Sequence, residues 1–124
     1  MENNQVATLC QIRDIYRSIA DFELRFQQKY NMCLNEGMLL CSLGSKKYSS
    51  SEIAGVLCLT NSNASKVIKS VEKKGLIKRI VGKDDKRQMY FTLTAEGQKR
   101  LASIKCSDLN IPESLKEVLI SYSR

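Results

Sequence analysis

Histidine is absent from the 124 residues of this chain, and no run of apolar residues is long enough to cross a membrane. Histidine is the commonest general base in enzymes and a frequent nitrogen ligand of zinc, so both roles lack their usual side chain. A membrane-spanning helix needs about 20 consecutive apolar residues. A secretory leader needs a basic segment followed by an apolar one, and the first residues show neither. We therefore expect a soluble, cytoplasmic protein with no membrane partner.

Cysteine is present but forms no recognisable site. There are five cysteines, an odd number, and no two of them stand at C-x-x-C spacing. We predict that they are small buried or half-buried side chains, and we expect no metal and no cofactor. They are Cys10, Cys33, Cys41, Cys58 and Cys106.

The chain also lacks a glycine-rich phosphate-binding loop. Its central carboxylates, Asp84, Asp85 and Glu96, lie in or near a basic segment, where they pair with lysine or arginine more readily than they act as catalytic acids. We therefore expect that the protein is not an enzyme.

Positive charge is concentrated in the middle of the chain. The net charge is +7, but residues 46–100 hold 13 lysines and arginines against 5 acidic residues, whereas the remainder holds 7 basic and 8 acidic residues. This distribution is typical of a lobe that binds a polyanion and is carried on a nearly neutral scaffold.

The first predicted helix runs from Val6 to Tyr30. Its apolar residues recur at spacings of three, four or seven, which is the pattern of one helical face. A helix of about 25 residues is too long for a small domain to cover along its whole length, so we expect a partner chain to cover part of it.

Three shorter helices follow. Asn35 is a candidate N-cap for the second helix, and Ser49 with Glu52 forms a capping box that begins the third. The polar residues 60–62 interrupt that helix and offer the N-cap of a fourth. Gly75 stands where a left-handed residue ends a helix, so the fourth helix should end there.

Beyond the fourth helix the apolar period changes from 3.6 to 2. Residues 77–81 and 89–93 alternate in polarity and enclose the polar stretch 82–87, which predicts a two-stranded hairpin. Thr94 then caps a helix, and Pro112 opens a last one. The predicted fold is a single domain, mostly α with a small β-hairpin wing, in the order α-α-α-α-β-β-α-α.

Two short helices joined by a tight turn and followed by a basic hairpin make a winged helix-turn-helix. The outer face of its fourth helix carries short polar side chains and lysines, which suit the major groove of DNA. An ordinary solvated helix face has a similar composition, so this helix alone does not decide the function. The candidate contacts are Ser62, Asn63, Ser65, Lys66, Lys69 and Ser70.

Three segments resemble the MarR family of bacterial transcription regulators. Residues 71–79 read V-E-K-K-G-L-I-K-R, close to the family's L-E-K-K-G-L-[IV]-x-R. Asp85 and Arg87 fit the family's D-x-R, and residues 92–97 read T-L-T-A-E-G, close to x-L-T-x-x-G. The spacing between these segments agrees as well, and the first and last helices are similar to the family's dimerisation helices.

The resemblance implies a homodimeric, sequence-specific regulator of double-stranded DNA, a repressor released by a small ligand or an oxidant. Dimerisation helices at about 5–30 and 95–123 would intertwine, and a DNA-binding lobe would span about 34–97. Helix 61–74 would enter the major groove of a pseudo-palindromic operator, and wing 82–87 the minor groove. In the wing, Arg87 would contact DNA and pair with Asp85, with Lys83 and Lys86 on the flanking phosphates.

Three alternatives stay open. One branch of the family senses organic peroxides through a cysteine in the first helix, which Cys10 loosely resembles. There a tyrosine lies one turn later, whereas here Tyr16 lies about 240° around the helix. A small-molecule pocket near Tyr30 to Met38 is the family's commoner device, although no residue identifies a ligand. A winged helix that contacts proteins would not need the basic surplus.

Overall fold

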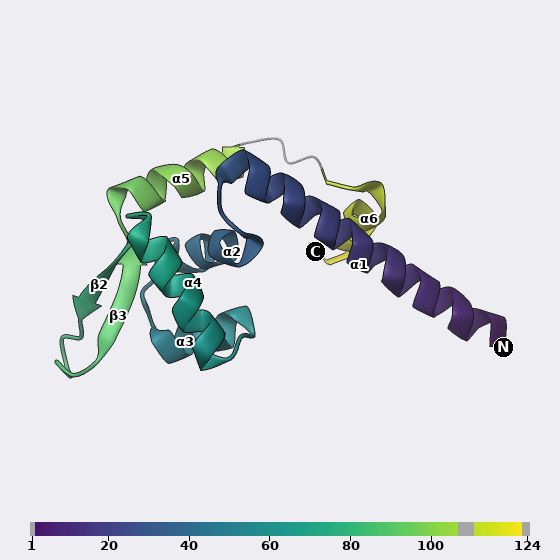
Figure 1. Cartoon of the computed structure of the whole chain (residues 1–124). Coiled ribbons are helices and arrows are strands. Elements are labelled where there is room, and N and C mark those ends of the chain that lie inside the picture. Colours follow the sequence, from purple (N-terminus) through teal and green to yellow (C-terminus); the bar gives the residue numbers. More distant parts are fainter. Residues whose placement is uncertain (1, 107–110, 123–124) are drawn as a thin grey trace. The chain divides into compact units, whose positions relative to one another are not determined.

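The computed structural model describes residues 2–106 and 111–122, and these residues form six helices and three short strands (Figure 1). This confirms the predicted class, mostly α with a β wing. The elements are α1 (Glu2–Tyr30), α2 (Leu34–Leu43), β1 (Tyr48–Ser49), α3 (Ser50–Leu57), α4 (Asn61–Lys73), β2 (Ile77–Val81), β3 (Met89–Leu93), α5 (Ala95–Cys106) and α6 (Glu113–Tyr122).

The chain divides into two compact units. One consists of Met1–Met32 with Asp108–Arg124 and contains α1 and α6. The other, Cys33–Ser107, contains α2 to α5 and the three strands, and we call it the winged-helix unit. The predicted DNA-binding lobe, residues 34–97, lies inside the winged-helix unit. The predicted division between a lobe and dimerisation helices stays a prediction.

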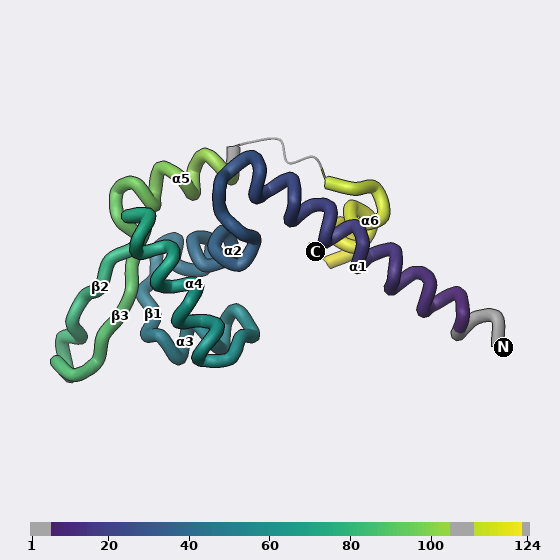
Figure 2. Tube along the Cα trace, viewed as in Figure 1, coloured from purple at the N-terminus to yellow at the C-terminus, as the bar shows by residue number. Residues whose placement is uncertain are grey.

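The sheet has three antiparallel strands in the order β1-β3-β2. Arg79 of β2 and Tyr48 of β1 both pair with Phe91 of the central strand. The sequence predicts only the hairpin of β2 and β3, so the two-strand count is wrong. Strand β1 has two residues, too few to show an alternating pattern. The turn between β2 and β3 lies at the end of the hairpin remote from α5 (Figure 2).

The core of the winged-helix unit is made by the apolar stripes that the sequence predicts. Burial of such side chains contributes about 1.5–3 kcal/mol each to folding and holds α3 and α4 against the sheet. The buried residues include Leu39, Leu40, Leu43, Ile53, Ala64, Ile68, Val71, Leu76, Ile77, Phe91, Leu93 and Leu101.

Capping side chains begin the two helices of the helix-turn-helix as predicted. The Glu52 amide donates to the Ser49 hydroxyl (3.3 Å), and the Ser49 amide donates to the Glu52 carboxylate (2.9 Å). At α4 the Asn63 amide donates to the Thr60 hydroxyl (3.1 Å). Both helix starts are therefore fixed by bonds within four residues.

The predicted N-cap of α2, Asn35, is wrong. The N-cap is Cys33, and the helix begins at Leu34. The Cys33 amide donates to the carboxylate of Glu36 (2.8 Å), three residues later. The glutamate supplies the capping bond, so this helix starts without a preferred capping residue at its N-cap position.

A left-handed glycine ends α4, as predicted. Gly75 has φ of +77°, the Leu76 amide donates to the Val71 carbonyl (3.2 Å), and the Gly75 amide donates to the Glu72 carbonyl (2.9 Å). These two bonds form a Schellman motif.

Thr94 joins this turn to the start of α5. Its hydroxyl donates to the Gly75 carbonyl (2.7 Å) and accepts from the Gly97 amide (3.0 Å), while its own amide donates to the Leu76 carbonyl (3.0 Å). Thr94 thus caps α5 and also fixes the turn at the end of α4. These bonds hold the turn after α4 and the start of α5 at a fixed distance from each other.

In the other unit, α1 packs against α6. The hydroxyls of Ser18 and Ser114 form a hydrogen bond between the two helices. The Phe26 ring packs in a tilted arrangement against the rings of Phe22 and Tyr30, with centroids 6.1 and 4.8 Å apart. Among the described residues, no helix has the length and apolar character required to span a membrane.

Candidate nucleic-acid interface

Helix α4 buries one face and exposes the other. Ala64, Ile68 and Val71 are buried in the core, which turns the polar side of the helix outward. Five of the six residues singled out from the sequence are exposed on that side, namely Ser62, Asn63, Ser65, Lys66 and Lys69. The structure therefore presents two lysines and three short polar side chains on one helix.

Ser70, the sixth residue, is half-buried and turned toward the protein. Its hydroxyl donates to the Glu36 carboxylate (2.7 Å). The side chain therefore connects α4 to α2. The sequence does not reveal this role, because the two residues lie 34 positions apart.

Glu36 is a buried carboxylate with three donors around it. It accepts from the Cys33 amide (2.8 Å), the Ser70 hydroxyl (2.7 Å) and the Lys74 ammonium (2.9 Å). Burial acts to raise its pKa, but the bonds from Lys74, Cys33 and Ser70 together outweigh burial and lower the pKa below its ordinary value. Glu36 is therefore ionised at neutral pH and links the first turn of α2 to the end of α4.

The wing turn carries an exposed arginine beside an aspartate. The Asp85 carboxylate accepts from the Arg87 amide (3.0 Å) and from the guanidinium Nε (3.3 Å). This confirms the predicted Asp85–Arg87 pair. The Arg87 side chain is 93% exposed, so the pair leaves most of the guanidinium available to a ligand.

The other basic residues fall into two groups. Arg79 is engaged by the fold: it makes two bonds to Glu72 (2.8 and 3.1 Å) and lies over the Phe91 ring (5.5 Å). By contrast, two exposed lysines of α4 and two of the wing turn make no ion pair with any described residue, namely Lys66, Lys69, Lys83 and Lys86. Other exposed lysines of the winged-helix unit also make none, namely Lys46, Lys47, Lys73 and Lys78.

The cysteines form no site in the part of the chain that is described. Cys10, Cys33, Cys41 and Cys58 are free thiols, and no cluster of metal-ligating side chains occurs among the described residues. Cys10 and Cys33 are half-buried as predicted. The same prediction is wrong for Cys41 and Cys58, which are exposed: Cys41 lies off the buried face of α2, and Cys58 is the left-handed C-cap beyond the end of α3. The side chain of Cys106 lies outside the described residues.

Comparison with known proteins agrees with this geometry. Residues 35–89 match the model of the MarR family, and no curated protein matches the chain. The transcriptional regulator BldR from Sulfolobus solfataricus is 24% identical, with 97% of this chain and 94% of that chain covered and a TM-score of 0.70. AbsC, a MarR family transcriptional regulator from Streptomyces coelicolor, is 20% identical, with 95% and 88% covered and a TM-score of 0.75.

A third solved structure is the S. aureus MepR–DNA complex. MepR is 20% identical to this chain, with 90% of this chain and 87% of that chain covered and a TM-score of 0.61. At such identities the likeness concerns the fold, while the family match concerns the sequence of residues 35–89 itself. The family and its structural neighbours are regulators of transcription and not enzymes, as predicted. The MarR family model thus matches residues 35–89, less than half of the chain, and the solved structures share the fold of the chain.

Proposed function

We propose that this protein is a homodimeric repressor that binds a pseudo-palindromic site on double-stranded DNA in the cytoplasm and is released by a small ligand or an oxidant. The observation that carries the proposal is the distribution of uncompensated charge. The lysines without ion pairs include Lys66 and Lys69 on α4 and Lys83 and Lys86 on the wing, whereas Lys74 and Arg79 are neutralised by Glu36 and Glu72. Free cations on these two elements suit a phosphate backbone.

Helix α4 is the element that enters the major groove in this proposal, over residues 61–74. Ser62, Asn63 and Ser65 lie in its first turns, where recognition helices contact base edges. Lys66 and Lys69 extend from the same face toward bases or phosphates. Ser70 is left out of the proposed contacts, because its hydroxyl is bonded to Glu36.

The wing, residues 82–87, is the element that follows the minor groove. A guanidinium is attracted by the negative potential of a narrow, A·T-rich minor groove and is only weakly hydrated. The bond from Asp85 restricts the Arg87 side chain, so less rotamer entropy is lost on binding. Lys83 and Lys86, exposed on the same turn, would contact the flanking phosphates.

A second copy of the chain is the proposed partner of the unit that contains α1 and α6. Along α1, Val6, Leu9, Ile12 and Tyr16 are 56–75% exposed, and on α6 Ile120 and Tyr122 are 73% and 89% exposed. Apolar side chains gathered in this way mark an interaction surface, and most such assemblies are two-fold symmetric. Two copies would present two winged-helix units to two half-sites.

Selection of bound sequences from random duplex DNA tests the proposal. We expect an inverted repeat whose half-sites are about one helical turn apart. The control is a variant in which Lys66, Lys69 and Arg87 are all alanine, which should enrich no sequence. Failure of the unmodified protein to enrich any sequence would contradict DNA recognition, and recovery of single half-sites would contradict the dimeric mode.

A further inference from the structure

A small cavity of about 220 Å³ lies between α4 and the β2–β3 hairpin, within the winged-helix unit. Residues of α4, β2 and β3 line it, together with Ser50, the first residue of α3. Pockets for drug-sized molecules start at roughly 300 Å³, so this cavity suits a smaller group. It lies between the two elements that the proposed function assigns to DNA, α4 and the hairpin that carries the wing.

Hydrogen-bond donors that the fold leaves unused line this cavity. The hydroxyls of Ser50 and Ser65 and the Lys69 ammonium bond to no described residue. Arg79 donates through Nε and Nη2 to Glu72 (2.8 and 3.1 Å), which leaves Nη1 without a partner among the described residues. Because the two bonds to Glu72 hold the planar guanidinium, Nη1 is a donor in a fixed position.

The charge of the lining selects an anion. Lys69 carries a full positive charge that no described carboxylate neutralises, whereas the charge of Arg79 is shared with Glu72. Within the described part of the chain, no acidic side chain lines the cavity. An anionic oxygen there would accept charge-assisted bonds from the ammonium and the guanidinium.

The rest of the lining is apolar and favours a phosphate diester over free phosphate. Ile68 and Phe91 are buried, and Met89 is 39% exposed. A backbone phosphate of DNA carries a sugar carbon on each of two oxygens, and removal of these carbons from water against Met89 is favourable. Inorganic phosphate has no such carbons and would leave this apolar surface in water.

The proposed positions of the two elements bring one DNA strand across this cavity. A sugar–phosphate backbone separates the major groove from the minor groove, so a helix in one groove and a hairpin in the next lie on either side of that backbone. The cavity lies between α4 and the hairpin, where the backbone has to pass. Phosphate contacts fix the register of a protein on the duplex, while base contacts carry the sequence preference.

We infer that this cavity binds one backbone phosphate of double-stranded DNA in each half-site, through the Lys69 ammonium and the hydroxyls of Ser50 and Ser65. Arg79 Nη1 supplies a further donor. The inference rests on the proposed function and narrows it, because Ser65 and Lys69 are now assigned to a phosphate and not to bases. Asn63, which does not line the cavity, keeps the base-reading role.

Duplexes with a neutral phosphate test the inference. The probe is the duplex sequence that the selection enriches, with an uncharged methylphosphonate at one position of both half-sites, moved stepwise along the strand. We expect the unmodified protein, used as the whole chain, to lose affinity about tenfold or more at the position that the cavity binds. In Lys69→Ala this loss should disappear at that position alone, and Ser50→Ala and Ser65→Ala should reduce it at the same position.

Lys66→Ala is the matched control, since Lys66 is an exposed lysine of the same helix that does not line the cavity. In this variant the loss at the position bound by the cavity should stay within about twofold of the loss in the unmodified protein. Lys69→Ala and Ser65→Ala should enrich the same sequences as the unmodified protein. Lys69→Ala should also reduce the salt slope by about one unit for each chain.

Each contrary result overturns the inference. If every loss persists in Lys69→Ala, the cavity holds no phosphate. A changed sequence preference of Ser65→Ala or Lys69→Ala would assign that side chain to a base. An unmodified protein that binds no duplex would overturn the proposed function as well, whereas DNA binding without a position coupled to Lys69 would overturn the phosphate site alone.

Discussion

Arg87 and Glu36 are charged residues in opposite surroundings. The Arg87 side chain is 93% exposed at the tip of the wing, whereas that of Glu36 is 7% exposed beneath α4. Exposed charges are available to a ligand and contribute little to stability, while a buried charge is strongly tied to its partners. The two residues should therefore respond to substitution in opposite ways.

We predict that Arg87→Ala leaves the Tm nearly unchanged and weakens DNA binding by about 1–3 kcal/mol, most strongly on sites with A·T-rich flanks. The reason is that the Asp85–Arg87 pair is exposed, whereas a guanidinium in a narrow minor groove is not. Affinity would be measured on matched duplexes with A·T-rich and G·C-rich flanks. Lys99→Ala, which removes one charge from an exposed pair on α5, is the control. Equal affinity of Arg87→Ala and the unmodified protein on both duplexes would exclude Arg87 from the interface.

We predict that Glu36→Gln lowers the free energy of unfolding by about 1–3 kcal/mol, because the amide no longer satisfies the partly buried Lys74 ammonium. Glu52→Gln is the matched control. Glu52 holds the same third position in its helix and caps the Ser49 amide, but it is exposed and has no lysine partner among the described residues. Urea unfolding of the two variants separates two contributions to stability. Both variants alter a helix cap, but only Glu36→Gln alters the link between α2 and α4. An equal loss in both variants would contradict this assignment.

The difference in unfolding free energy between the unmodified protein and Glu36→Gln should decrease as the pH falls. The folded-state pKa of Glu36 is lowered, so its carboxylate contributes stability that is fully present above the unfolded pKa of about 4.3. That contribution is lost as the pH falls through the lower folded pKa. The difference between the unmodified protein and Glu36→Gln should therefore shrink as urea unfolding is repeated from pH 7 toward pH 3.5. A difference that stays constant would show that the charge of Glu36 does not carry the effect.

Among the elements, the junction between the end of α4 and the start of α5 requires glycine at position 97, because a side chain does not fit there. A Cβ added at Gly97 would clash with the Leu76 carbonyl oxygen, which also accepts from the Thr94 amide. Backbone on both sides of this contact is held by hydrogen bonds, so neither side can move away without breaking them.

We predict that Gly97→Ala destabilises the protein by more than about 3 kcal/mol, the range of severe overpacking. Gly55→Ala in α3 is the control, since a Cβ there meets no atom within 4 Å. That change should be neutral or stabilise by about 0.5–1 kcal/mol, because alanine is the better helix former. Thermal and urea unfolding would measure both. Similar stabilities of the two variants would show that the α4–α5 junction tolerates a side chain at Gly97.

At the scale of the whole molecule, the exposed apolar stripe of α1 leads to a prediction about assembly. Sedimentation should report a dimer, and Leu9→Glu should shift it toward monomer, because a charge would enter the proposed interface. Gln11→Glu, about 200° around the helix, should leave the dimer intact. Removal of residues 107–124 should weaken both the dimer and DNA binding. If that deletion leaves dimer mass and DNA affinity unchanged, the terminal helices are not the interface.

Features made by residues close together in the chain could be predicted from residue type and spacing alone. The capping box of Ser49, the cap at Thr60 and the left-handed Gly75 use bonds that reach at most a few residues, so residue type and spacing are enough to predict them. The segment from Val71 to Arg79 carries the family resemblance for the same reason, and the outward face of α4 follows from its helical period.

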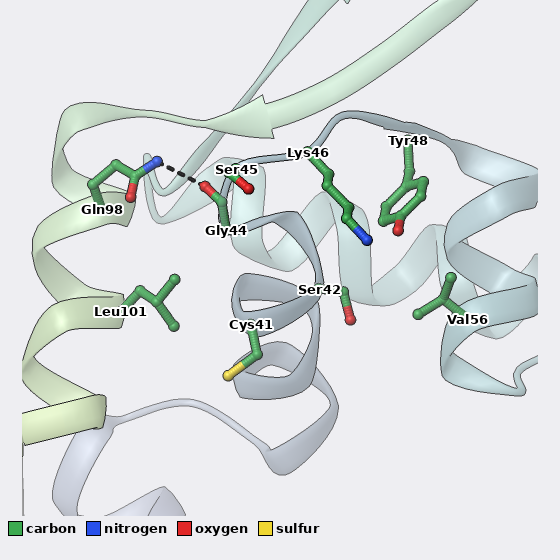
Figure 3. A pocket seen from close by; sticks show the side chains of 9 residues that line it. All are labelled: Cys41, Ser42, Gly44, Ser45, Lys46, Tyr48, Val56, Gln98 and Leu101. Atoms are coloured by element: carbon green, nitrogen blue, oxygen red, sulfur yellow. Dashed lines mark hydrogen bonds between the residues drawn. The ribbon is translucent and has the colours of Figure 1, made fainter.

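Contacts between residues far apart in the chain could not be predicted in this way. Ser70 is a residue type that often contacts DNA, yet its hydroxyl donates to the Glu36 carboxylate. Lys74 counts toward the basic surplus of the sequence, yet its charge is neutralised by the same carboxylate. Strand β1 exists because Tyr48 meets Phe91 across more than 40 residues of chain. A cavity beside Lys46 likewise needs α3 and α5 together (Figure 3). Local patterns cannot encode such partners, because packing between separate elements determines which groups meet and which stay exposed.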